Sequence, residues 1–161
     1  MAILMSVLGG GSAFMEENTD IKKPKHREVI AITSIAKVAT IAAYAFRAAH
    51  GLPFVLPKKK FGYMKNFMYM MFSNPMEEDF EVDPAILRAL EVIFITHADH
   101  EQNASTSTVR ISGSSFANPF AVLSSGIASL WGPAHGGANE AVLKMLNSIG
   151  HVDNIPGFIE Q

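Results

Sequence analysis

The chain has 161 residues, with 13 basic and 15 acidic side chains, six histidines and no cysteine. Apolar residues make up 48% of it, which suits one packed globular body and argues against disorder. The near balance of charge leaves no electrostatic footprint for nucleic acid, and the lack of cysteine excludes a disulfide framework and a thiolate metal site. A reducing, cytoplasmic setting fits this composition.

The segment from Met1 to Met15 is uncharged and mostly apolar. It has no positively charged n-region and is interrupted by Gly9-Gly10-Gly11, so we interpret it as a buried helix rather than a targeting signal. That helix begins without a cap, and a further helix starts at about Ile155, close to the other end. We therefore expect an internal fragment of a longer protein.

A long apolar helix is predicted from about Arg27 to His50, because Gly51 occupies the position of a C′ glycine and Pro53 follows it. Its length and apolarity are compatible with a membrane span. Lys37 and Arg47 lie inside it, however, and charges are costly in a bilayer. We expect a core helix of a soluble protein, without a membrane.

Shorter helices are predicted in the rest of the chain, at 64–72, 84–97, 119–130 and 137–149. Asp83-Pro84 and Asn118-Pro119 each combine an N-cap residue with a proline at the first helical position. Gly150 closes the last of these helices. Sustained period-two alternation bounded by hairpin turns is absent from the sequence, so the expected fold class is all-α.

Two histidines and two carboxylates lie together near the end of the 84–97 helix. His97 and His100 are three residues apart, so they share one face of a helix, and Asp99 and Glu101 flank His100. A zinc site is one hypothesis, and histidines hydrogen-bonded inside a helical protein are the alternative. The hydroxyl and amide residues of 103–108 suit a polar pocket, or an ordinary capping and turn region.

His135 lies in a glycine-rich break, with Pro133 before it and Gly136 and Gly137 after it. A helix is predicted just beyond, and a helix N-terminus leaves N–H groups unpaired. Its dipole disfavours a protonated imidazole and favours a developing oxyanion. A neutral histidine there can polarise a carbonyl by donating a hydrogen bond. The alternative is a histidine that only orders the turn.

Two segments carry a resemblance to a known family: HADHEQNASTSTVR at 97–110 and LWGPAHGGANEA at 130–141. Together they resemble citrate synthase of the bacterial (type II) form. Weaker similarity covers nearly the whole chain, including 51–57, 66–72 and 155–156.

This resemblance implies an acyltransferase that converts the acyl group to alkyl on transfer. The enzyme condenses acetyl-CoA with oxaloacetate and water, giving citrate and CoA, in the tricarboxylic acid cycle. It implies a homo-oligomer, a dimer or a hexamer, with no metal and no cofactor besides acetyl-CoA as substrate. Residues 1–136 would be part of the large helical domain, and residues 137–161 the beginning of the small domain that closes over the substrates.

The resemblance also implies roles for particular residues. His135 would be the neutral imidazole that hydrogen-bonds the acetyl-CoA carbonyl as it enolises. His100 would bind oxaloacetate and polarise its carbonyl. Ser105 would orient His135, a role that sets tautomer and direction. Asn103 and Gly136 would bind substrate, and His97 would support the site.

Two departures from the family pattern stand out. The carboxylate base, a second catalytic histidine and the substrate-binding arginines are expected beyond Gln161, so the fragment alone is expected to be inactive. Phe116 stands where relatives usually have glycine. Two other functions fit the same residues: a 2-methylcitrate synthase that takes propionyl-CoA, and a non-catalytic helical assembly module.

Overall fold

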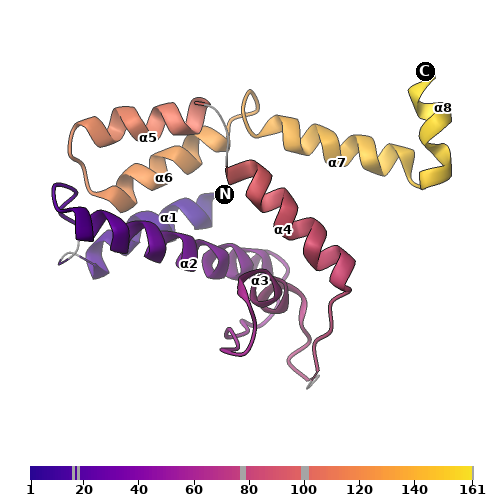
Figure 1. Cartoon of the computed structure of the whole chain (residues 1–161), viewed down its shortest axis with the longest axis horizontal. Coiled ribbons are helices and arrows are strands. Elements are labelled where there is room, and N and C mark those ends of the chain that lie inside the picture. The colour runs from indigo at the N-terminus through magenta and orange to yellow at the C-terminus, as the bar shows by residue number, and fades with distance from the viewer. Residues whose placement is uncertain (16, 18, 77–78, 99–101, 161) are drawn as a thin grey trace.

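The chain is described by a computed structural model, in which residues 1–15, 17, 19–76, 79–98 and 102–160 are placed. Every regular element within these ranges is helical, which confirms the all-α fold class (Figure 1). The elements are, in order, α1 (Ala2–Gly10), the 3₁₀ helix η1 (Gly11–Phe14), α2 (Pro24–Ala49), α3 (Tyr63–Phe72), α4 (Pro84–Ala98), α5 (Ala104–Ser114), α6 (Pro119–Leu130), α7 (Gly137–Ile149), the 3₁₀ helix η3 (Val152–Asn154) and α8 (Ile155–Ile159).

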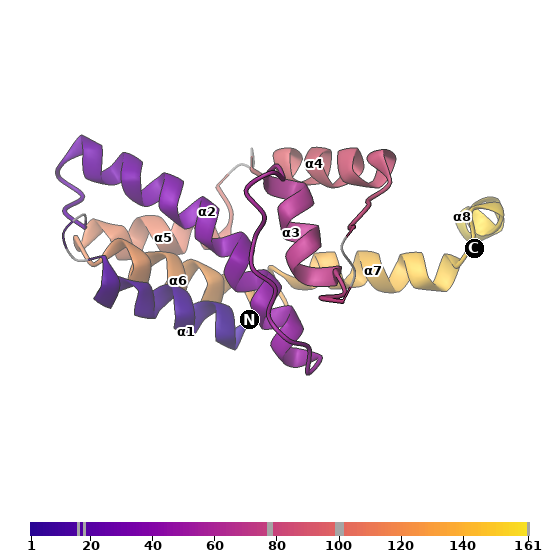
Figure 2. The same ribbon diagram turned by 90° about the horizontal axis from the view of Figure 1, so that it is seen from below.

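One group of helices is organised around α6, which lies between α1 and α5 (Figure 2). Phe120, at the start of α6, is 1% exposed and forms the centre of this packing with Leu8 of α1. The hydroxyl of Ser124 donates a hydrogen bond to the carbonyl oxygen of Met5 at 2.9 Å, which joins α6 to α1. Because α6 is covered on both sides, its position is fixed by two neighbours at once.

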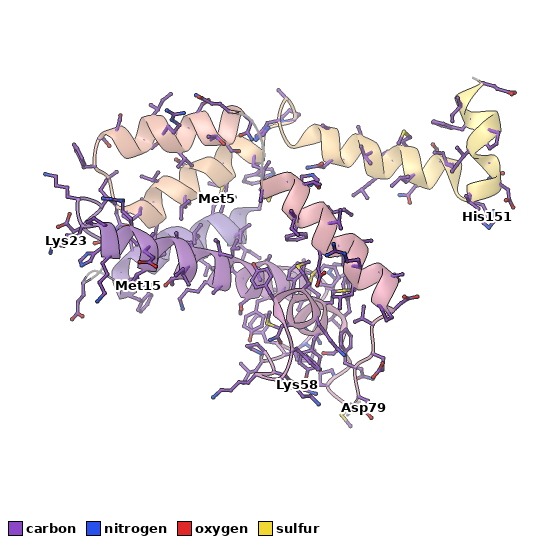
Figure 3. The ribbon with its side chains drawn as sticks, in the orientation of Figure 1. Met5, Met15, Lys23, Lys58, Asp79 and His151 are labelled. Carbon is purple, nitrogen blue, oxygen red and sulfur yellow. The ribbon has the colours of Figure 1, made fainter. Side chains whose placement is uncertain are left out.

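A second group forms where α3 packs on the C-terminal half of α2, with aromatic rings and methionine sulfurs gathered around α3 (Figure 3). Arg47 of α2 is 2% exposed at its centre. Its Nη1 donates to the carbonyl oxygens of Met71 at 3.0 Å and Ser73 at 3.1 Å, and its Nε donates to the carbonyl of Pro53. The carbonyls at the end of α3 lack helical partners and carry the negative end of its dipole, so they compensate the buried charge.

The predicted helix ends are confirmed where local chemistry determines them. Oδ1 of Asp83 accepts from the N–H of Ala85 at 2.7 Å, and Oδ1 of Asn118 accepts from the N–H of Phe120 at 3.0 Å. At the end of α2, Gly51 has φ +66°, and the N–H of Leu52 donates to the carbonyl of Arg47. This is a Schellman motif. The helix starts at Pro24, three residues before the predicted start, because proline suits a first helical position.

The N-terminal segment is helical as predicted, but the prediction that it is buried is wrong for most of its length. Leu8 is the buried residue of α1, whereas Val7 is 50% exposed. The helix continues through Gly9 and Gly10. α1 packs on α6 and also contacts α2, and several of its other apolar side chains, such as Ile3 and Val7, are exposed.

The long helix α2 meets the length and apolarity of a membrane span, and 17% of its most apolar window is buried in this structure. Core helices of water-soluble proteins pass the same test. Buried positions recur along it from Ile30 to Arg47, facing the other helices. Its interpretation as a core helix stays a prediction.

The segment 104–114 is a helix that the sequence analysis did not predict as one, and it ends at an unusual backbone conformation. Phe116, two residues after α5, has φ +59°. This is the left-handed region, which a side chain makes costly and which glycine occupies freely. The conformation gives a physical reason for the glycine that the resemblance leads us to expect at this position.

The last part of the chain extends away from the other helices (Figure 1). α7 ends at Gly150, which has φ +71°, and His151 marks the bend towards α8 (Figure 3). Leu143 and Leu146 of α7 are 62% and 53% exposed. The predicted division of the chain at residues 136 and 137 stays a prediction.

Candidate active site

The helical hairpin of α5 and α6 positions the first side chain of the site. Ser105, Val109 and Ser112 are spaced four and three residues apart, so they share one face of α5. The hydroxyls of Ser112 and Ser125 lie 3.2 Å apart, which shows that this face meets α6. The hairpin therefore brings the first turn of α5, with Ser105, to the last turn of α6.

His135 lies just beyond that last turn and contacts Ser105. Its Nε2 is 2.7 Å from Oγ of Ser105, and both residues are half-buried. A separation of 2.7 Å between a ring nitrogen and a hydroxyl is a short, well-formed hydrogen bond. The structure thus brings together the two residues that the sequence analysis paired, while their roles stay predictions.

A tight turn holds His135 in place. The N–H groups of His135 and Gly136 both donate to the carbonyl of Gly132, at 3.1 and 2.9 Å. A Cβ added to Gly136 would lie 2.1 Å from the carbonyl oxygen of Leu130, a separation that real Cβ atoms do not show. Gly136 therefore serves the geometry of the turn, and its predicted contact with substrate stays a prediction.

Asn103 has a definite structural task at the start of α5. Its Oδ1 accepts a hydrogen bond from the N–H of Thr106 at 2.9 Å, so it is the N-cap of the helix. The preceding Gln102 donates to Oγ of Ser107 at 3.2 Å and accepts from Nη1 of Arg110 at 3.0 Å. These bonds fix the entry into α5. The capping interpretation is confirmed, and a substrate contact by Asn103 stays a prediction.

His97 lies in the last turn of α4. Its Nδ1 donates to the carbonyl oxygen of Ile93 at 2.7 Å, and its side chain is exposed. It borders a groove of about 770 Å³ between α4 and α7, which Asn139 also lines. The rest of the groove is apolar, formed by Ile93, Phe94, Val142, Leu143 and Leu146.

His100, the predicted oxaloacetate ligand, lies outside the described residues, as do Asp99 and Glu101. Within the described ranges, no three His, Cys, Asp or Glu side chains are grouped to hold a metal ion. The zinc hypothesis joined His97 to those three residues, so the described part of the chain does not test it.

The first turn of α7 provides the electrostatic setting beside His135. Its N-cap is Gly136, which supplies no side-chain hydrogen bond. Glu140 lies in this turn, and the Lys144 ammonium, 2.7 Å away, lowers the pKa of its carboxyl through a hydrogen bond and through charge attraction. Glu140 is therefore ionised at neutral pH, as suits the positive end of the helix dipole.

Gly126 belongs to this geometry but was not singled out from the sequence. A Cβ on Gly126 would lie 2.7 Å from Cγ2 of Val109, so the glycine allows α5 and α6 to approach closely. The available signal was a glycine inside an apolar helix, which often has a packing reason. The spacing of residues in the sequence does not show that Gly126 contacts Val109.

These features define an all-α protein in which a histidine just before a helix is hydrogen-bonded to a serine, an arrangement suited to polarising a carbonyl. The profile of the family "Citrate synthase, C-terminal domain" matches residues 1–161. The chain belongs to the citrate synthase family, whose members are condensing enzymes of the transferase class.

Solved structures agree with this assignment. The chain is similar to the citrate synthase from Pyrobaculum aerophilum, with 33% identity and a TM-score of 0.76 over 93% of this chain. It is also similar to the citrate synthase from Thermotoga maritima MSB8, with 28% identity and a TM-score of 0.65 over 98% of this chain. The chain spans 39% of the length of each of these two proteins.

Proposed function

We propose that this chain contributes the carbonyl-activating part of the active site of a citrate synthase of the bacterial type II form. The complete enzyme would condense acetyl-CoA with oxaloacetate and water to give citrate and CoA, in the tricarboxylic acid cycle. The observation that carries this proposal is the hydrogen bond of 2.7 Å between Ser105 and His135, at the start of α7.

The chemistry requires an electrophile because a proton α to a thioester is far less acidic than a carboxylic acid. A carboxylate base can remove it only if the enolate oxygen is stabilised as the charge develops. With the Ser105 hydroxyl donating to Nε2, the neutral imidazole of His135 carries its proton on Nδ1. That N–H can donate to the thioester oxygen.

The second carbonyl belongs to oxaloacetate, and we assign its polarisation to His100. Asn103 and Gly136 are proposed to border the substrates, and His97 to support the site from the end of α4. The resemblance at 97–110 and 130–141 supports these four assignments. The cap that Asn103 forms and the turn that Gly136 permits hold the same loops in position.

The proposal includes the state of the complete enzyme. We propose a cytoplasmic homo-oligomer, a dimer or a hexamer, that needs no metal and takes acetyl-CoA as substrate rather than as a bound cofactor. Residues 1–161 by themselves would not catalyse the condensation, because the family's carboxylate base has no counterpart among the motifs recognised in them. Activity that survives a strong chelator supports the metal-free proposal, and activity lost to it overturns that part.

Two alternatives make different predictions for the same experiment. A 2-methylcitrate synthase uses the same mechanism with propionyl-CoA, so its kcat/KM is higher for propionyl-CoA than for acetyl-CoA. A non-catalytic helical assembly module releases no CoA from either thioester. The family assignment favours an enzyme over the assembly module.

The test is replacement of His135 in the complete enzyme. We expect His135→Ala to slow exchange of the acetyl methyl protons with solvent, and CoA release, by roughly 100-fold or more. The helical circular dichroism signal should persist. His151→Ala is the matched control, because His151 is exposed at the far end of α7. CoA release by His135→Ala at the wild-type rate would overturn the role proposed for this residue.

A further inference from the structure

We infer that Gly126 is a positioning residue for the active site, because its missing side chain lets α5 lie close enough to α6 for Ser105 to reach His135. The catalytic consequence of this inference rests on the proposed function. Its structural part, the link from Gly126 to the hydrogen bond between Ser105 and His135, stands on geometry alone.

The close approach is specific to one point of the hairpin. Gly126 is buried in α6, and a Cβ on it would lie 2.7 Å from Cγ2 of Val109 and 3.7 Å from the carbonyl oxygen of Ser105. Real Cβ atoms essentially never show contacts below 3.0 Å, so a side chain at 126 forces something to move. The atom in the way belongs to a β-branched side chain, whose rotamers are few in a helix.

Val109 cannot yield without affecting Ser105. It lies one turn after Ser105 on the same face of α5, and helix geometry fixes the distance between the two. α6 has little freedom to retreat, because α1 packs on its other side through the bond from Ser124 to Met5. The shift therefore falls on α5, and it carries the Ser105 hydroxyl away from α6.

His135 does not follow that shift, since it is anchored to α6. Leu130 is four residues after Gly126, and its carbonyl oxygen packs against Gly136, directly after the histidine. A separation of α5 from α6 thus lengthens the contact of 2.7 Å between the two side chains. Hydrogen bonds weaken steeply with such changes, and a misplacement of about 1 Å costs on the order of 100-fold in rate.

The experiment compares Gly126→Ala, Val109→Ala and the double variant in the complete enzyme. The double variant is informative because Val109→Ala removes the atom that the new Cβ would meet. The readouts are the ¹⁵N and ¹H imidazole resonances of His135, which report the hydrogen bond at Nε2, and kcat and KM for acetyl-CoA. Gly10→Ala is the matched control, since Gly10 is also in a helix and has nothing within 4 Å of an added Cβ.

We expect Gly126→Ala to alter the His135 Nε2 resonance and to lower kcat by about 10- to 100-fold, with KM nearly unchanged. The double variant should recover the resonance and a kcat within about threefold of Val109→Ala, as pairs in contact are not additive. Gly10→Ala should match the wild type. If Gly126→Ala does not fold, the double variant carries the test: it should fold and show the wild-type resonance.

An unchanged Nε2 resonance in Gly126→Ala overturns the inference, and so does a double variant that folds without recovering it. The remaining outcome separates the inference from the proposed function. If Gly126→Ala loses the hydrogen bond but keeps full activity, then Gly126 does position Ser105. In that case the proposed catalytic role of the Ser105–His135 hydrogen bond is wrong.

Discussion

Gly136 packs against the last turn of α6 so closely that a Cβ at this position would lie 2.1 Å from the carbonyl oxygen of Leu130. The neighbouring Gly137 has no such constraint, because its Cβ would meet Cβ of Pro133 at 3.9 Å, an ordinary contact. Two adjacent glycines therefore have different reasons to be there, although the sequence presents them as one motif.

The first prediction follows from this difference. Gly136→Ala forces the turn open and displaces His135, so we expect a loss of stability of about 1–3 kcal/mol. We also expect a fall in kcat on the order of 100-fold in the complete enzyme. Urea unfolding and steady-state kinetics measure the two effects. Gly137→Ala is the control, and equal behaviour of the two variants would show that the turn does not depend on the approach to Leu130.

The second prediction concerns the hydroxyl of Ser105. Ser105→Ala leaves α5 intact but releases the imidazole of His135 from its partner, so we expect kcat to fall about 10- to 100-fold while KM changes little. Ser114→Ala, in the last turn of the same helix, removes an exposed hydroxyl that bonds only the carbonyl of Ile111 in its own turn. A Ser105→Ala enzyme with the kcat of Ser114→Ala would contradict an orienting role.

Helix ends were predictable from the sequence because their determinants are local. Asp83 and Asn118 each cap the helix that the next proline begins, and Gly150 ends α7, all within a few residues of the atoms they serve. His135 and Ser105 were paired through the family resemblance, and the structure places them 2.7 Å apart. The helix ends need no knowledge of distant contacts, whereas the Ser105–His135 pair spans 30 residues and was predicted only through the resemblance.

The features that could not be predicted depend on segments far along the chain. The Ser- and Thr-rich segment 104–114 has weak helix propensity, and packing against α6 makes it a helix. The exposure of α1 depends on which neighbours cover it. Gly126 meets Val109 from another helix, and no spacing rule shows that contact.

The third prediction uses the left-handed conformation of Phe116. Its φ of +59° is strained for a residue with a side chain, so Phe116→Gly should stabilise the fold by about 0.5–1 kcal/mol. The Lys22 ammonium lies 5.1 Å from the centre of the ring, and the loss of this exposed contact offsets part of the gain. Thermal unfolding measures the change.

Phe116→Ala separates the two effects, because it removes the ring but keeps a Cβ in the strained conformation. It should be less stable than Phe116→Gly. Since neither variant has the ring, their difference reports the backbone alone, and the opposite order would show that the left-handed conformation does not limit stability at this position.

The fourth prediction concerns the buried guanidinium of Arg47. Arg47→Met leaves the carbonyl oxygens of Met71 and Ser73 without their buried donor, so we expect a loss of about 3 kcal/mol or failure to fold. Arg88→Met is the control, since Arg88 forms only an exposed pair with Glu91 at 3.2 Å and should change stability by less than about 1 kcal/mol. Similar urea midpoints for the two variants would contradict a structural role for Arg47.

The helical hairpin of α5 and α6 also has a consequence for how the protein is made. The partners of the Ser105–His135 bond are only 30 residues apart, so closing this loop costs little chain entropy. Contacts of low sequence separation form fast, and a nascent chain can make this one as soon as the hairpin has left the ribosome. His135 can then already contact Ser105 when later segments are synthesised, and those segments would pack against a hairpin that has formed.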